Sequence, residues 1–193
     1  NILDSCIDEL LCGLLDKGYD ITVRPHPEYV KRYTAAMQSL ISRYEARFGE
    51  HFRIETDFSS NVTIFTADLV ITDWSGIAFE FSYATKKPCL FIDTPMKVMN
   101  PDYKKIDCVP VELSMRNEIG LSVSPDEMGT VANKVAHLLK SESLYTKIIN
   151  NVIERYLYYP GRSAEIASDY IIAAAKAENK KTAAKEPELS LKL

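Results

Sequence analysis

Short apolar runs alternate along the chain with longer stretches in which apolar residues recur every three or four positions. The short runs, typical of strands, lie at 21–23, 52–55, 69–71, 89–92 and 120–123. The longer stretches have the spacing of amphipathic helices. Strands that alternate with helices predict an α/β fold, with a Rossmann-like parallel sheet and helices on both faces.

Capping signals bound several of the expected helices. Gly18 and Gly49 are placed to end helices, and Ser124 is followed by Pro and two acids, a helix-start signature. The helix after Gly76 is expected to bury a face made of Ile77, Phe81 and Ala84. We expect helices over roughly 4–17, 28–48, a short segment ending near 65, 77–84, 125–140, 142–158 and 163–178.

Length and composition fit one domain with a core of conventional size. The chain has 193 residues, of which 46% are hydrophobic and 26% charged. The sequence predicts a domain over 1–178 and a disordered tail over 179–193, where Lys, Ala and Glu dominate without a packing stripe. The chain starts on a helical pattern without Met, so we expect a piece of a larger protein.

Charge and cysteine usage exclude several classes of protein. The net charge of −4 argues against a nucleic-acid surface, and no apolar run approaches the ~20 residues of a membrane span. No secretory signal is visible. The cysteines form no C-x-x-C pair and the histidines are not spaced to join them, so no metal site is expected. We predict reduced core thiols in a cytosolic protein at Cys6, Cys12, Cys89 and Cys108.

The most informative segment is 67–93, a strand, a polar turn, a helix and a second strand. Ligands of parallel sheets bind at the carboxyl ends of strands, against helix N-termini whose free N–H groups suit a phosphate. Ser75 adds a hydroxyl there, and Gly76 has no side chain to keep a phosphate from the backbone. Asp73 either caps the helix, orients Ser75 or meets a ligand hydroxyl. The alternative for the whole turn is plain helix capping without a ligand.

Two side chains beside this turn have open roles. Trp74, the only tryptophan, either stacks on a base or packs against the protein. Glu80, one helical turn beyond Gly76, either reaches a ribose or a second substrate, or is a solvated acid.

His26 follows the first strand between Pro25 and Pro27, which restrict its backbone. We expect it at the same sheet edge as the Ser75 turn, where it would exchange a proton or bind phosphate as a cation. The alternative is a turn histidine with a structural hydrogen bond.

A second Gly–Ser helix start lies at Gly161-Arg162-Ser163. Arg162 adds a fork of donors able to hold two phosphate oxygens. The alternative is a turn between helices with a surface arginine. The sequence contains neither G-x-G-x-x-G nor a P-loop, so it does not support ordinary dinucleotide or P-loop binding.

Four motifs in order carry a family resemblance. They are R-P-H-P at 24–27, D-L-V-I-T-D-W-S-G at 68–76 followed by an acid in F-E-F, K-P-C-L-F-I-D at 87–93, and G-R-S-A-E-I at 161–166. In this order they resemble the CDP-glycerol glycerophosphotransferase family of teichoic-acid and capsule synthesis, over about 20–175. The resemblance implies the C-terminal, donor-binding half of a GT-B architecture.

The resemblance also implies residue roles. His26 stands where the family has its H-P histidine beside the pyrophosphate, and is the expected catalytic residue. Trp74, Gly76 and Glu80 depart from the family's Tyr, Ser and Asp. No cofactor or metal is implied, because the CDP-linked donor is the substrate. The implied donor- and phosphate-binding residues are Arg24, Thr72, Asp73, Ser75, Gly76, Glu80, Gly161, Arg162 and Ser163.

The implied reaction is attack by an acceptor hydroxyl on the β-phosphate of CDP-glycerol, or of a related CDP-alditol, with release of CMP. The partners are then a nucleotide-diphosphate donor and a cell-surface polymer acceptor, which would bind an N-terminal domain outside this chain. We expect no nucleic acid partner and no membrane span. The location implied is the bacterial cytoplasm, at the inner membrane face for the whole protein. The chain alone is expected to be inactive.

Two alternatives stay open. One is a GT-B transferase acting on UDP-sugars, or an enzyme similar to UDP-N-acetylglucosamine 2-epimerase. The other is a nucleotide-binding module without catalysis. The nucleotide base that is bound distinguishes the first alternative from an enzyme that uses a CDP-linked donor. The second alternative predicts that even the whole protein transfers nothing.

Overall fold

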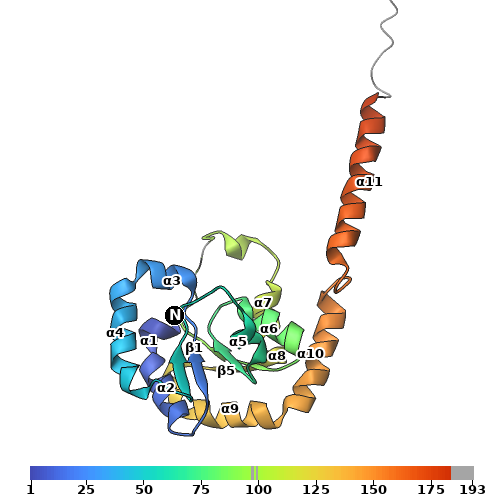
Figure 1. The fold of residues 1–193 in the computed structure, drawn as a ribbon. Coiled ribbons are helices and arrows are strands. Elements are labelled where there is room, and N and C mark those ends of the chain that lie inside the picture. Colours follow the sequence, from blue (N-terminus) through green and yellow to red (C-terminus); the bar gives the residue numbers. More distant parts are fainter. Residues whose placement is uncertain (97, 99, 184–193) are drawn as a thin grey trace, which may run out of the picture. The chain divides into compact units, whose positions relative to one another are not determined.

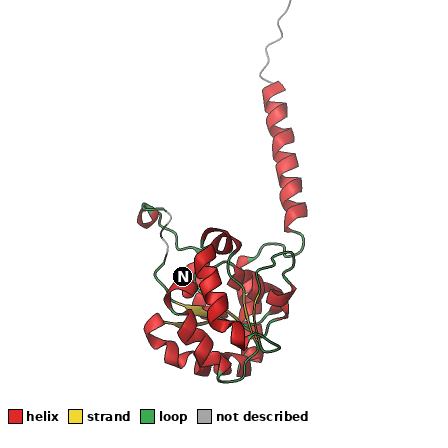
Figure 2. Ribbon diagram, turned by 60° about the vertical axis from the view of Figure 1, so that its left-hand side comes forward, coloured by secondary structure: helices red, strands yellow, loops and turns green. Residues whose placement is uncertain are grey.

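The computed structural model describes residues 1–96, 98 and 100–183, in which parallel strands lie among helices (Figure 1 and Figure 2). The strands are β1 Ile21–Val23, β2 Phe52–Ile54, β3 Val70–Thr72, β4 Cys89–Ile92 and β5 Gly120–Val123. The α-helices are α1 Ile2–Ser5, α2 Ile7–Leu15, α3 Pro27–Arg32, α4 Thr34–Tyr44, α5 Val62–Thr66, α6 Ile77–Thr85, α7 Val111–Ser114, α8 Arg116–Ile119, α9 Val131–Lys140, α10 Glu142–Tyr156 and α11 Ser163–Ala183. Short 3₁₀ segments are η1 Glu45–Arg47, η2 Tyr103–Lys105 and η3 Pro125–Thr130.

All strand pairs in the described residues are parallel, as the alternating pattern predicted. β1 pairs with β2, and β4 lies between β3 and β5 in a three-stranded sheet. The strands therefore form two hydrogen-bonded sheets and not one. In the part of the chain described, β3 pairs with β4 and forms no hydrogen-bonded ladder with β1 or β2. The expectation that His26 and the Ser75 turn follow strands of one sheet is thus wrong.

The central strand β4 is buried on both faces. Cys89 Sγ lies 3.4 Å from Ser82 Oγ of α6, and the ring of Phe91 packs against Phe79 of the same helix. Alternate residues of a strand point to opposite faces, so Leu90 and Ile92 face away from α6. Both are fully buried, and α9 contacts β4 and β5. Helices therefore cover both faces, which confirms the α/β, Rossmann-like prediction.

Backbone breaks divide three of the predicted helices. Cys6 and Tyr33 leave helical geometry, so α1 separates from α2 and α3 from α4. The expected helix 125–140 begins with a 3₁₀ segment that is kinked at Glu127. Cys6 is buried in the core at the first of these breaks.

The buried face of α6 differs from the expected one. Phe81 is fully buried as expected, but Ala84 is exposed and Ile77 is half-buried. Ala78 and Ser82 complete the face instead, because Ser82 and the carbonyl of Ala78 meet Cys89 of β4. The prediction of Ala84 as a core position is therefore wrong, and Ile77 is only partly buried.

The chain divides into two compact units, Asn1–Ile153 and Glu154–Leu193. The second unit contains α11, which extends through Ala183. Residues 184–193 lie outside the described residues, so the predicted boundary at 178 and the disordered tail stay predictions.

Two further findings bear on the sequence predictions. No described helix has the length and hydropathy to cross a membrane. The four cysteines are free, and Cys6 and Cys89 are buried, but Cys12 and Cys108 are exposed. The expectation of core thiols is therefore wrong for the last two.

Candidate functional site

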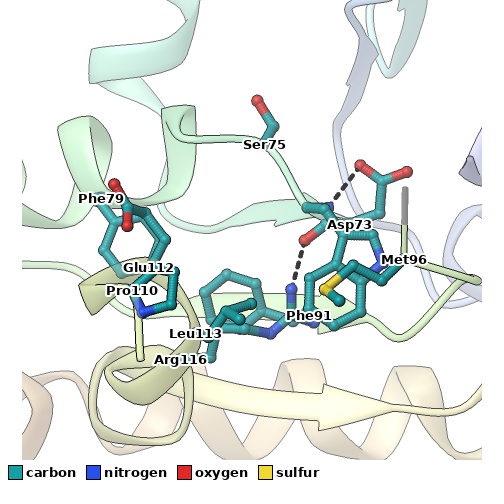
Figure 3. Close-up of a pocket in the computed structure, with 10 residues that line it drawn as sticks. Asp73, Ser75, Phe79, Phe91, Met96, Pro110, Glu112, Leu113 and Arg116 are labelled. Carbon is teal, nitrogen blue, oxygen red and sulfur yellow. Dashed lines mark hydrogen bonds between the residues drawn. The ribbon is translucent and has the colours of Figure 1, made fainter. Parts of the chain in front are cut away.

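A cavity of about 240 Å³ lies beside the turn between β3 and α6. The turn lines it with Asp73, Trp74 and Ser75, and α6 and β4 add Phe79 and Phe91 (Figure 3). The wall across from the turn comes from the segment after β4, and its residues are Met96, Pro110, Glu112, Leu113 and Arg116. The predicted turn therefore does open onto a cavity at the carboxyl end of a parallel strand, where ligands of such sheets bind.

The turn leaves two backbone donors free. Gly76 is the N-cap of α6, and the N–H groups of Ser75 and Gly76 have no hydrogen-bond partner among the described residues. Ser75 Oγ lies 3.4 Å from the N–H of Ile77, so its hydroxyl proton remains available. Free N–H groups, a hydroxyl and the positive end of the α6 dipole make this turn suitable for an anion.

Asp73 caps its own turn. Its carboxylate accepts a hydrogen bond of 2.8 Å from the N–H of Trp74. Of the two roles considered for Trp74, the structure supports packing, because its Nε1–H donates to the carbonyl of Thr94 at 2.6 Å. The residue as a whole is still 36% exposed.

Arg116 is the residue at this site that sequence reasoning missed. Its side chain is 7% exposed, pairs with the Asp93 carboxylate and donates to the backbone carbonyl of Asp73 at 2.8 Å (Figure 3). Its guanidinium carbon lies 3.9 Å from the ring centre of Trp74 and 4.4 Å from that of Phe91. Burial lowers the pKa of Arg116 from its ordinary value, and the Asp93 carboxylate opposes that shift.

One signal in the sequence pointed to Arg116. It is the only arginine between Arg53 and Arg155 in the sequence. It lies about one helical turn before the strand 120–123. A charged residue so close to a buried strand needs a partner. Arg116 lies between the strands 89–92 and 120–123, in a segment whose contacts cannot be read from residue spacing.

His26 is exposed and caps α3. Its Nδ1 accepts a hydrogen bond of 3.1 Å from the N–H of Glu28. In the neutral ring, assigned from this hydrogen bond, the proton is on Nε2. His26 therefore forms the structural hydrogen bond of the turn histidine that was considered, and its neutral ring keeps one N–H donor at Nε2. It does not line the cavity beside Ser75.

Arg24 makes its contacts within the chain. Its guanidinium donates to the carbonyl of Ser60 at 2.6 Å and to Asn61 Oδ1 at 3.1 Å, and it pairs with Glu55 at 3.4 Å. It also lies over the ring of Phe58. The side chain ties the loop after β2 to the end of β1, and its expected phosphate role stays a prediction.

The remaining members of the expected set lie in two places. Thr72 is the half-buried last residue of β3, and Glu80 is exposed in the first turn of α6. Gly161, Arg162 and Ser163 belong to the second unit. There the Ser163 hydroxyl donates to the carbonyl of Tyr158 at 2.8 Å, and Arg162 pairs with Glu165 at 3.0 Å. Their donor-binding roles stay predictions.

The described residues contain no group of three His, Cys, Asp or Glu side chains placed to hold a metal ion. The groups that the cavity offers a ligand are aromatic faces, two carboxylates, one buried guanidinium and the free donors of the turn.

The fold and this site define a Rossmann-like α/β domain with a cavity at the carboxyl end of β3. The chain belongs to the CDP-glycerol:poly(glycerophosphate) glycerophosphotransferase family, whose model matches residues 5–101. The matched region contains His26 and the whole β3–α6 turn, and ends before Arg116. The family is one of transferases. Comparisons with curated proteins and with solved structures gave no match.

Proposed function

We propose that this chain binds the nucleotide-linked donor of a glycerophosphotransferase, with the donor's diphosphate on the β3–α6 turn. The observation that carries the proposal is the pair of free N–H groups at Ser75 and Gly76 beside a cavity, within the region matched to the family. An anion there would receive two backbone hydrogen bonds and the Ser75 hydroxyl.

The reaction proposed is transfer of glycerol phosphate, or a related alditol phosphate, from a CDP-linked donor to a polymer hydroxyl. The acceptor oxygen bonds to the β-phosphorus, the bond from that phosphorus to the bridging oxygen breaks, and CMP leaves. The hydroxyl proton passes to a base. Charge grows on the leaving phosphate, so donors held in place before the reaction lower the barrier. Ser75, Gly76 and the Nε2–H of His26 are the donors that we assign to this task.

The proposal also assigns donor-binding roles to Glu80 and to two residues of the second unit. Glu80 is exposed in the first turn of α6, and we assign it to a hydroxyl of the donor. Arg162 and Ser163 are assigned to the diphosphate from the sequence motif alone. The chain is assigned the donor half of the reaction, within a GT-B architecture.

Calorimetric titration of the chain with CDP, UDP and ADP in parallel tests this function. Selective binding of CDP is expected, and Ser75→Ala is expected to weaken it by about tenfold through loss of one charge-assisted hydrogen bond. Ser143→Ala is the matched control, since Ser143 is exposed on α10. Selective UDP binding would favour the enzymes acting on UDP-sugars. Equal affinities for CDP in both variants would refute the site.

A further inference from the structure

Arg116 holds the β3–α6 turn from the side of β4 and α8. One Nη donates to the carbonyl of Asp73, and the other pairs with the carboxylate of Asp93, just beyond β4. The guanidinium group lies over the ring of Trp74 and over that of Phe91. One side chain thus contacts the backbone of the turn, an aromatic residue of the turn and the neighbouring strand.

The contact with the Asp73 carbonyl sets the direction of the next backbone donor. The peptide unit is planar and trans, so its C=O and N–H groups point in opposite directions. With the Asp73 carbonyl held by Arg116, the N–H of Trp74 points the other way, where the Asp73 carboxylate accepts it at 2.8 Å. The backbone orientation just before Ser75 is thereby set, and the N–H groups of Ser75 and Gly76 have no hydrogen-bond partner in the described part of the chain.

The side chain of Trp74 is fixed as well. Its Nε1–H donates to the carbonyl of Thr94, and its ring stacks on the guanidinium of Arg116. A buried arginine cannot leave this position without loss of an ion pair and of two ring contacts. The turn is therefore held at its backbone and at its largest side chain by the same residue.

We propose that Arg116 is a positioning residue, which presets the Asp73–Gly76 turn to receive the donor's phosphate. This inference rests on the proposed function. Arg116 acts through the turn, since two of its donor groups are used by Asp73 and Asp93. Lysine cannot replace it, because an ammonium lacks both the fork that spans two acceptors and the plane that stacks on aromatic rings.

The chain carries a built-in reporter of this arrangement, because Trp74 is its only tryptophan. The variants Arg116→Met and Arg116→Lys are titrated with CDP by calorimetry and by Trp74 emission. Methionine retains the buried volume, and Asp93 is 42% exposed, so its carboxylate stays solvated in the variant. Arg43→Met and Arg43→Lys are the controls, since Arg43 forms a half-exposed pair with Asp8 on other elements.

The expected result is a CDP dissociation constant raised at least about tenfold in both Arg116 variants, with far-UV circular dichroism unchanged. Trp74 emission should shift to the red without ligand, because the ring loses its stacking partner. The Arg43 variants should match the wild type in both measurements. Folded Arg116 variants that bind CDP within about twofold of the wild type would overturn the proposal.

A measurement on the wild-type chain covers the case in which both Arg116 variants fail to fold. In ¹⁵N NMR, the Nε–H signal of Arg116 and the indole signal of Trp74 should move on CDP addition, together with the amides of Ser75 and Gly76. Static Arg116 and Trp74 signals while the amides move would overturn the positioning role alone. Absence of CDP binding by the wild type would overturn the proposed function and this inference with it.

Discussion

The Nδ1 atom of His26 accepts a hydrogen bond of 3.1 Å from the backbone N–H of Glu28, at the start of α3. The same side chain stands in the region matched to the glycerophosphotransferase family. We therefore assign its two ring nitrogens separate tasks: Nδ1 caps the helix, and Nε2 is the donor proposed for the phosphate.

Substitution of His26 by Asn and by Ala separates the two tasks. Asn accepts from the first-turn N–H groups as a good N-cap, so His26→Asn should keep the free energy of unfolding, and His26→Ala should lose about 1 kcal/mol or less. Both variants lose the Nε2 donor, and both should bind CDP more weakly in calorimetric titration. His26→Asn with wild-type CDP affinity would leave His26 a structural residue only.

Gly76→Ala should weaken ligand binding without harm to the fold. Gly76 has φ −62° and ψ −17°, and an added Cβ would meet no atom within 4 Å. The methyl group would instead occupy the approach to the free N–H groups of the turn. We expect an unfolding midpoint equal to or above that of the wild type and a CDP dissociation constant raised about tenfold. Unchanged affinity would show that no phosphate comes close to this backbone.

Gly120→Ala should destabilise the protein strongly. A Cβ at Gly120 would lie 1.8 Å from the carbonyl oxygen of Cys89, on the neighbouring strand β4. Two backbones would have to separate, so we expect a loss of about 3 kcal/mol or more in urea unfolding. Gly13→Ala is the control and should raise the free energy of unfolding. Its Cβ would meet no atom within 4 Å in α2, and alanine favours a helix over glycine by about 1 kcal/mol. A loss at Gly13 and none at Gly120 would contradict the β4–β5 register.

Stability should depend on pH through His51 and Asp20. His51 Nδ1 lies 2.5 Å from Asp20 Oδ1, and this hydrogen bond, with the charge of Asp20, raises the pKa of His51. A raised histidine pKa gives a stabilising contribution that is present below the unfolded value of about 6.5 and lost as the pH rises through the folded value. Both side chains are exposed, so the effect is small.

The measurement is the difference in unfolding free energy between the wild type and Asp20→Asn. It should be larger near about pH 6 than near about pH 8.5, and an NMR titration should give a His51 pKa that falls in the variant. The same difference at both pH values would mean that the ion pair does not form in solution.

The sequence by itself determined the alternation of strands and helices, the position of each strand and the turn at Asp73–Gly76. A strand buried on both faces must be apolar along its whole length, so an apolar run bounded by turn residues predicts such a strand from local sequence alone. β4 meets this requirement at all four positions. The four motifs, taken in order, also indicated the family, since they are local strings of residues.

Only the tertiary structure decided which residues meet at the cavity. Arg116 is far from Asp73 in the sequence and reaches it because β3, β4 and β5 lie side by side. The separation of β1 and β2 from the other strands, and the engagement of Arg24 with the loop after β2, are likewise decided by packing. Residue spacing predicts which face of an element a side chain occupies, but contacts between distant elements depend on how their surfaces fit, which no local pattern encodes.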